Sequence, residues 1–295
     1  MKKLIVIAGP TASGKTALAL KLATHFQTAV LSGDSRQCYH EMSIGVAKPS
    51  PTQLQQVPHY FIGSHSIHDQ VSAGIYEQYG LACLQELFKK KDVVICVGGT
   101  GLYLQALCEG LDPLPEVPVA VNQDVEEGFA QQGLIWLQEE IKYHDPLFAQ
   151  QGEMTNPARL MRALAFVRAH GISILSMHTA KKRKRPFEIY PYALQIDRAT
   201  LHAHIQQRTH SMMDMGLLDE VRTLLPHQSL RCLRSVGYSE LFAHLDGQMS
   251  LDEAVEKIIQ HTRQYAKRQI TWFKHQGAYT WMTAEEIYND VLLHL

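Results

Sequence analysis

The sequence predicts an α/β fold, a parallel β-sheet core flanked by helices, with a mostly helical insertion domain. Apolar runs that lead into glycine-bearing turns, as buried parallel strands do, lie at residues 4–8, 29–32 and 92–97. Segments with helical spacing follow at residues 17–26, at 76–88 and from about 102. Residues 112–185 keep the helical spacing with little strand signal, which indicates the insertion.

Length and composition fit a globular chain with one elaborated domain or two unequal domains. The chain has 295 residues, of which 45% are hydrophobic and 19% charged. Prolines make residues 47–71 loop-rich, and three more just after residue 112 mark a boundary. We assign residues 1–111 and 190–295 to the α/β core with its C-terminal helices, and 112–189 to the helical insertion.

Charge and cysteine usage exclude several classes of protein. The formal net charge of −1 gives no overall attraction to nucleic acid, so a polyanion must meet a local basic face. The five cysteines are scattered and form no C-x-x-C pair, which indicates reduced thiols. The 16 histidines show no zinc-binding spacing, and no apolar run reaches the length of a membrane span. We expect a cytoplasmic protein without a transition metal or membrane contact.

The first predicted strand runs directly into G-x-x-x-x-G-K-T. In this motif the backbone N–H groups of the loop and the positive end of the next helix face one anion, so the core resembles a P-loop NTPase. The Lys15 side chain adds a charge, and the Thr16 hydroxyl is the expected ligand of Mg²⁺, the one cofactor we predict. The predicted phosphate-binding residues are Gly9, Pro10, Thr11, Ala12, Ser13, Gly14, Lys15 and Thr16.

Two carboxylates follow predicted strands. Asp34 comes after the strand at 29–32, where the ends of parallel strands line a ligand crevice, so it is a candidate base. An Asp-Ser pair is equally suited to cap a turn or helix, and the residues alone leave both interpretations open. Asp197 ends a strand predicted at 192–197 and either caps the next helix or replaces the Walker B carboxylate, which is missing after residue 97.

Helices are expected at residues 201–215 and 217–225, and a long one starts at the capping box Ser250-x-x-Glu253. Along this long helix, aromatic residues alternate with Arg263, Lys267 and Lys274. The pattern suits RNA phosphates and splayed bases, or a surface helix whose aromatic side chains pack inwards. The basic run at 181–185 is likewise either a solvated loop or an RNA phosphate contact.

Five segments together resemble the bacterial tRNA dimethylallyltransferase family, also called tRNA isopentenyltransferases or IPP transferases. These segments are GPTASGKT, GDSRQCYHEMSIGVAKP, VGGTGLYLQALCEGL, RSVGY and TRQYAKRQITWF, and the match spans nearly the whole chain. Members of this family prenylate N6 of the adenosine 3′ of the anticodon, at position 37 of tRNA. The resemblance implies dimethylallyl diphosphate rather than ATP in the loop, the tRNA anticodon stem-loop as partner and diphosphate as product. We expect a monomer.

The resemblance also implies roles for individual residues. Asp34 takes a proton from the adenine amino group, Thr11 donates a hydrogen bond to the bridging oxygen, and Arg208 binds the diphosphate, so these three are the candidate catalytic residues. The family's tRNA-contacting positions fall on Asp34, Ser35, Arg36, Gln37, Thr100, Asn122, Ala158, Arg159, Leu160, Met161, Arg162, Arg234, Gly237, Tyr238, Lys267, Arg268, Gln269, Trp272 and Lys274. Asn122 stands where many relatives have arginine, and Val71-Ser72-Ala73-Gly74-Ile75-Tyr76 lacks a carboxylate that relatives carry there.

Three other functions compete with this one. A small-molecule or nucleoside kinase has the same loop and base, but it transfers the γ-phosphoryl group of ATP. A non-catalytic RNA-binding protein would use the loop as a nucleotide sensor, although the N-K-x-D motif of GTPases is absent. A prenyltransferase could also act on a free adenine nucleotide, whereas the helical insertion and the basic C-terminal helix favour RNA.

Overall fold

The computed structural model describes residues 2–179 and 181–294. It divides into two compact units, which we call the core unit, Met1–Gly110 with Lys184–Leu295, and the helical unit, Leu111–Arg183. In the described ranges no helix has both the length and the apolar character that a membrane span requires.

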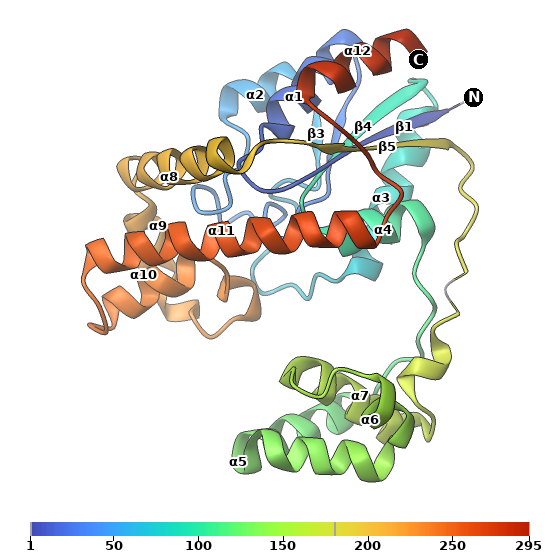
Figure 1. Cartoon of the computed structure of the whole chain (residues 1–295), viewed down its shortest axis with the longest axis vertical. Coiled ribbons are helices and arrows are strands. Elements are labelled where there is room, and N and C mark those ends of the chain that lie inside the picture. The colour runs from blue at the N-terminus through green and yellow to red at the C-terminus, as the bar shows by residue number, and fades with distance from the viewer. Residues whose placement is uncertain (1, 180, 295) are drawn as a thin grey trace. The chain divides into compact units, whose positions relative to one another are not determined.

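The described part of the core unit contains a parallel six-stranded sheet with the strand order β3-β2-β4-β1-β5-β6 (Figure 1). Its strands are β1 Lys3–Ala8, β2 Val30–Ser32, β3 His59–Tyr60, β4 Val93–Val97, β5 Glu188–Leu194 and β6 Thr280–Met282. β1 and β4 are the central pair and are buried along their apolar stretches. Their hydrophobic runs therefore place the two following loops side by side at one edge of the sheet.

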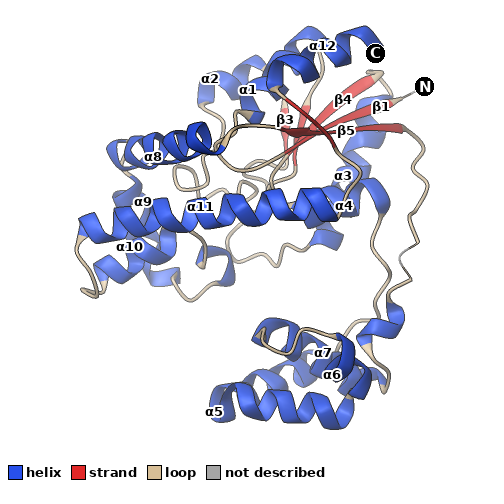
Figure 2. Ribbon diagram, in the orientation of Figure 1, coloured by secondary structure: helices blue, strands red, loops and turns tan. Residues whose placement is uncertain are grey.

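Helices cover both faces of this sheet (Figures 1 and 2). One face carries α1 Lys15–His25 and α12 Ala284–His294, and the other carries α3 Ala73–Phe88, α4 Gly101–Glu109 and α11 Leu251–His275. Leu18 and Leu22 of α1 pack on Ile5 and Ile95 of the strands in one hydrophobic core. The remaining helices of the unit are α2 Pro51–Gln56, α8 Arg198–Asp214, α9 Leu217–Leu224 and α10 Tyr238–Leu245, with short 3₁₀ turns at Leu225–His227 and Arg231–Leu233.

The helical unit has a core of its own. It consists of α5 Val119–His144, α6 Pro146–Gln151, α7 Pro157–His170 and a 3₁₀ turn at Ile174–Met177. Gly133, with φ of +76°, interrupts α5. Asp145 and Asn156 cap the starts of α6 and α7 by accepting from backbone N–H groups. Buried side chains of α5 and α7 pack together, among them Leu137, Ile141, Leu164 and Phe166.

The structure confirms the α/β fold and extends the sequence prediction in several places. Residues 47–71, predicted as loop-rich, contain α2 and β3, and the sequence did not predict α10, β6 or α12. Asp197 is the N-cap of α8, accepting from the Thr200 N–H at 2.9 Å, so its cap interpretation is the one the structure supports.

Arg185, at the end of the basic run, is neither solvated nor exposed to a ligand. Its guanidinium donates to the Glu77 carboxylate at 2.8 Å and to the Ala106 carbonyl at 2.7 Å. Only 7% of the Arg185 side chain and 10% of the Glu77 side chain are exposed. Both interpretations of the basic run at 181–185, a solvated loop or an RNA phosphate contact, are therefore wrong at Arg185. Its charge pairs instead with a buried carboxylate that is distant in the sequence.

Two glycines let the loops after β2 and β4 approach each other. A Cβ on Gly98 would lie 2.2 Å from the carbonyl oxygen of Gly33, well inside van der Waals contact. The Gly33 N–H meanwhile donates to the Val97 carbonyl at 2.7 Å. The backbone just before Asp34 is thus held by a contact that only glycine permits.

We expect Gly98→Ala to destabilise the protein by about 1–3 kcal/mol, because backbone must move to admit the methyl group. The matched control is Gly74→Ala in α3, where the added Cβ meets only the Ser72 hydroxyl oxygen at 3.8 Å. That change should be neutral or should stabilise by up to about 1 kcal/mol. Thermal and denaturant unfolding measure both, and equal stability of the two variants would contradict the packing argument.

Candidate active site

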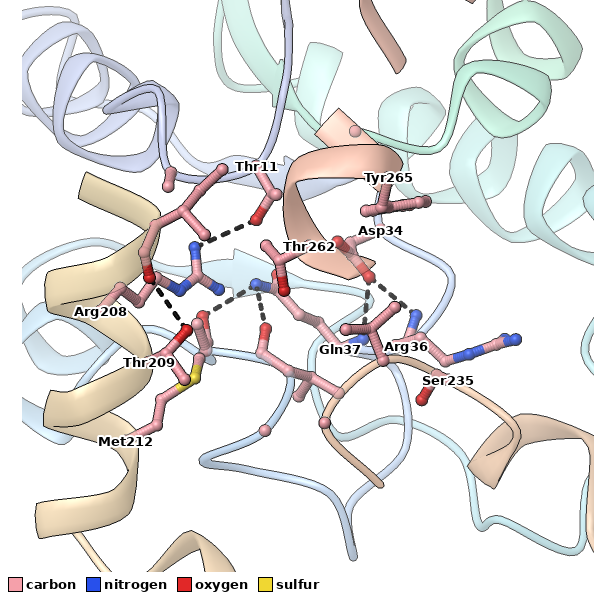
Figure 3. Close-up of a pocket in the computed structure, with 18 of the residues that line it drawn as sticks. Thr11, Asp34, Arg36, Gln37, Arg208, Thr209, Met212, Ser235, Thr262 and Tyr265 are labelled. Atoms are coloured by element: carbon pink, nitrogen blue, oxygen red, sulfur yellow. Dashed lines mark hydrogen bonds between the residues drawn. The ribbon is translucent and has the colours of Figure 1, made fainter. Parts of the chain in front are cut away.

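A cavity of about 860 Å³ lies at the carboxyl ends of β1, β2 and β4. Its walls come from the loops after these strands and from side chains of α8 and α11 (Figure 3). This edge is where open parallel α/β sheets bind ligands, since the strand ends and the helix starts converge there.

The loop after β1 has the backbone of a phosphate-binding loop. Gly9, Ala12 and Gly14 have φ angles of +140°, +62° and +90°, so the chain turns tightly before α1 begins at Lys15. A Cβ on Gly9 would lie 3.3 Å from the backbone nitrogen of Leu194 on β5. The Ser13 hydroxyl is buried and has no hydrogen-bond partner among the described residues. A loop with an unsatisfied buried hydroxyl at a helix N-terminus fits an anionic ligand.

Two cations lie together in this cavity. Lys15 Nζ donates to the Pro10 carbonyl, and Arg208 of α8 donates to the Thr11 hydroxyl at 3.3 Å (Figure 3). Burial and, to a smaller extent, the charge of Arg208 lower the pKa of Lys15 to about 7, although the nearby Asp34 carboxylate acts in the opposite direction. Burial also lowers the pKa of Arg208. Positive charge has been moved out of water here with one carboxylate to offset it, so an anion would be stabilised.

Asp34 both caps a turn and faces the cavity. Its Oδ1 accepts from the Arg36 N–H at 2.8 Å and from the Gln37 N–H at 3.3 Å (Figure 3). No hydrogen bond from a described residue is found at Oδ2. The structure therefore confirms the cap interpretation at Oδ1, and Oδ2 remains available as an acceptor.

Polar contacts also fix the residues around Asp34. The Thr100 hydroxyl accepts from the Ser35 N–H at 3.0 Å and donates to the Ser35 hydroxyl at 3.2 Å. The Gln37 amide donates to the Val46 and Ala47 carbonyls at 3.2 and 3.0 Å, and its oxygen accepts from Ser32 at 3.1 Å. The side chain of Gln37 thus holds a neighbouring loop, while the residue still lines the cavity.

The structure brings many of the predicted site residues to this cavity and places others elsewhere. The ones that line it are Thr11, Ala12, Ser13, Gly14, Lys15, Thr16, Asp34, Ser35, Arg36, Gln37, Arg208, Arg234, Gly237, Arg268 and Gln269. Lys267 and Lys274 are exposed on α11, and Trp272 packs against Gly101. Tyr238 is fully buried, and its hydroxyl donates to Glu220, so its side chain is not at the surface.

Gln269 connects α11 to two of the loops. Its amide oxygen accepts from the Thr11 N–H at 2.8 Å, and its nitrogen donates to the Gly99 carbonyl at 2.9 Å. Only 6% of the residue is exposed. Both ends of the amide are therefore occupied by protein, and the residue stabilises the phosphate loop in this structure.

Predicted tRNA-binding residues of the helical unit lie on α5 and α7. Asn122 is exposed near the start of α5, and Ala158, Arg159 and Arg162 are exposed on α7. Met161 is partly buried, and Leu160 is fully buried in the unit's core, where no ligand reaches its side chain.

Sequence reasoning missed several residues of the cavity wall. On α8 these include Thr209 and Met212, and on α11 they include Thr262 and Tyr265 (Figure 3). The signal was present, since Met212 follows Arg208 by four residues and Tyr265 precedes Gln269 by four. Residues so spaced share one face of a helix.

The described residues contain no group of three or more His, Cys, Asp or Glu side chains that suits a metal ion. Mg²⁺ needs no such cluster when a phosphate ligand and water supply most of its oxygens. Thr16 lines the cavity in the first turn of α1, so its hydroxyl fits that limited role.

Comparisons with known proteins agree on one family. The family model described as IPP transferase matches residues 37–276. The tRNA dimethylallyltransferase 1 of Bacteroides thetaiotaomicron is 41% identical over 286 residues, which cover 97% of this chain and 93% of that protein. The tRNA dimethylallyltransferase of Cytophaga hutchinsonii is 42% identical over 286 residues, covering 97% and 94%.

Solved structures give the same result. The full-length tRNA isopentenylpyrophosphate transferase of Bacillus halodurans is similar with a TM-score of 0.72 and 28% identity, covering 99% of this chain and 96% of that one. A eukaryotic dimethylallyltransferase acting on tRNA is similar with a TM-score of 0.79 and 23% identity, covering 96% of this chain and 74% of the other. The latter likeness concerns the fold.

The lowered pKa of Lys15 predicts how the binding of inorganic diphosphate depends on pH. Below about pH 7 Lys15 is already protonated, whereas above it the anion must draw a proton onto the amine. The dissociation constant should therefore rise above pH 7, by up to about tenfold per pH unit. Isothermal titration calorimetry from pH 6 to 9 measures this.

Lys15→Arg is the matched control, because a guanidinium stays charged over this range. Titration of diphosphate itself affects both proteins equally, so the difference between the two profiles reports Lys15. Identical profiles for the wild type and Lys15→Arg would show that the amine does not titrate in this range.

Proposed function

The chain belongs to the IPP transferase family, and we propose that it transfers the dimethylallyl group of dimethylallyl diphosphate to N6 of adenosine 37, 3′ of the anticodon, in tRNA. Diphosphate is the other product. The observation that carries this proposal is the cavity itself, where a phosphate loop with two cations and the carboxylate of Asp34 line one space. Relatives matched over nearly the whole chain are named tRNA dimethylallyltransferases.

Stabilisation of the leaving group is the largest effect we assign to the cavity. As the bond from carbon to the bridging oxygen breaks, charge grows on the diphosphate, which the loop N–H groups, Lys15 and Arg208 meet without reorganising. Because the Thr11 hydroxyl accepts from Arg208, its own hydrogen can point at the bridging oxygen. Loss of one such donor costs on the order of 3 kcal/mol in the barrier.

We propose that Mg²⁺ is the cofactor and that the Thr16 hydroxyl is its side-chain ligand. The buried Ser13 hydroxyl and the cationic surroundings of the loop suit the diphosphate that would share this ion. When bound, Mg²⁺ neutralises part of the diphosphate charge.

Asp34 is the proposed base. The adenine amino nitrogen is a weak nucleophile, since its lone pair is delocalised into the ring, and removal of its proton as the N–C bond forms increases its reactivity. The proton goes to Asp34, the new bond joins N6 to the allylic carbon, and the electron pair of the broken C–O bond leaves with diphosphate. Two backbone N–H groups hold Oδ1 while this happens.

The acceptor adenine must leave the stack of the anticodon loop to reach a cavity of this kind. We propose that Ser35, Arg36 and Gln37, which line the cavity, surround it, that Thr100 holds Ser35 through its hydroxyl, and that basic residues bind tRNA phosphates. The basic residues are Arg36, Arg159, Arg162, Arg234, Lys267, Arg268 and Lys274. In the helical unit, Asn122 and the exposed face of α7 would contact the anticodon stem-loop.

The kinase hypothesis is not favoured. The strand that would carry a Walker B carboxylate, β4, runs into Gly98 and Gly99, and the Asp197 carboxylate caps α8.

The five cysteines are all unbridged, in keeping with the cytoplasmic location that we propose for an enzyme of tRNA. One chain supplies all the proposed residues, so we propose a monomer.

Incubation of the protein with dimethylallyl diphosphate, Mg²⁺ and unmodified tRNA, followed by mass analysis of the nucleosides, tests the proposal. We expect one dimethylallyl group on one adenosine, with release of diphosphate. Transfer of a γ-phosphate from ATP without the allylic substrate would instead support a kinase. Tight tRNA binding without turnover would support a non-catalytic protein.

Asp34→Asn should lower kcat by on the order of 100-fold or more while leaving the affinity for tRNA nearly unchanged. Asparagine is isosteric, and its oxygen can still accept from the N–H groups of Arg36 and Gln37, so the turn is retained. Single-turnover kinetics and filter binding measure the two quantities. Asp197→Asn, outside the cavity, is the control, and an unchanged kcat for Asp34→Asn would remove Asp34 as the base.

A further inference from the structure

The loop at residues 43–47 forms one wall of the cavity without regular secondary structure. Gly45, Val46 and Ala47 line the cavity directly. Ala47 has a φ of +47°, in the left-handed region that disfavours residues with a Cβ. A conformation of this kind persists when its surroundings impose it, so a specific contact must hold the loop.

That contact is Glu220 on α9. Its Oε2 accepts from the N–H groups of Ser43 at 3.0 Å and of Ile44 at 2.7 Å. Its Oε1 accepts from the Gly45 N–H at 3.1 Å and from the Tyr238 hydroxyl at 2.6 Å. Four donors thus converge on the two oxygens, and three of them are consecutive backbone amides more than 170 residues away in the sequence.

A carboxylate is the side chain that satisfies this arrangement. Each Glu220 oxygen accepts two hydrogen bonds, whereas an amide would place an N–H₂ group against two donors. Tyr238 fits beneath the loop because residue 45 is glycine, since a Cβ there would lie 2.6 Å from the Tyr238 ring. Charge, hydrogen bonding and packing therefore select the same loop position.

The loop that Glu220 holds is bonded in turn to the turn containing Asp34. The carbonyls of Val46 and Ala47 accept from the Gln37 amide, as described above. The Gln37 N–H donates to Oδ1 of Asp34. Glu220 is therefore linked to the carboxylate of Asp34 through its hydrogen bonds to the loop, the loop backbone itself and the hydrogen bonds of Gln37.

We infer that Glu220 is a positioning residue for the acceptor half of the active site. It does not line the cavity, and it holds the loop and Gln37 so that the adenine meets Asp34. This inference rests on the proposed function. The phosphate loop is held by other contacts, those of Gln269 and Arg208, so the grip on the diphosphate does not depend on Glu220.

Glu220→Gln tests the inference, because it keeps the size and removes one acceptor. We expect kcat/KM for tRNA to fall by about ten- to a hundredfold, as for a displaced reacting group. The dissociation constant of inorganic diphosphate should stay within about twofold of the wild type, which also shows that the protein is folded.

Glu41→Gln is the matched control. The Glu41 carboxylate also accepts from a backbone N–H, that of Ile67 at 3.0 Å, and from the Ser66 hydroxyl at 2.7 Å, but Glu41 does not line the cavity. It should leave kcat/KM for tRNA unchanged. An equal loss in both variants, or no loss in Glu220→Gln, would overturn the inference.

A double-mutant cycle with Gln37→Ala separates positioning from a general loss of stability. The cycle compares the effect of Glu220→Gln on kcat/KM for tRNA in the wild-type protein and in the Gln37→Ala variant. If Glu220 acts through Gln37, the loss is much smaller in the Gln37→Ala variant. Independent, multiplicative losses would contradict this route. A wild-type protein that modifies no tRNA would refute the proposed function instead, whereas an active wild type with an unaffected Glu220→Gln variant refutes the inference alone.

Discussion

The site depends on two half-buried cations that lie next to each other, Lys15 and Arg208. Lys15 and Arg208 lie at the end of β1, and burial is the main reason that the pKa of each is lowered. Asp34 acts on both in the opposite direction. Without a ligand this arrangement is electrostatically unfavourable, and a bound anion would relieve it. In the function that we propose, this electrostatic cost contributes binding energy for the leaving diphosphate.

This constraint explains why so much of the structure stabilises loops. The phosphate loop contains positive φ angles at Gly9, Ala12 and Gly14, and the one at Ala12 is disfavoured for a residue with a Cβ, so contacts must hold the loop. Gln269 holds its start from α11, and Arg208 contacts the same residue, Thr11, from α8. Helices α8 and α11, which come late in the chain, therefore hold the phosphate loop, which lies near its start.

Sequence alone predicted the parts of the fold and site that depend on local patterns. Strands β1 and β4 and the phosphate loop follow from contiguous residues, and Asp34 follows from its place after β2. The short elements α2, β3 and β6 have too few residues for a periodic signal. Gln37, Tyr238 and Gln269 were predicted at the tRNA, but sequence cannot tell whether a polar side chain meets ligand or protein. Glu220 gave no signal, since its partners are more than 170 residues away.

Helix α11 is the element that relates the two halves of the site. Gly99 and Gly101 let it approach the end of β4, because a Cβ on either would lie within 2.3 Å of Gln269 or Trp272. At this separation Gln269 reaches the phosphate loop, while Tyr265 and Arg268 of the same helix line the cavity. A shift of α11 would therefore move the phosphate loop and the wall of the cavity together. Transfer requires that the two substrates be held at a fixed distance from each other. One helix that contacts both halves of the site fixes this distance better than two separate loops would.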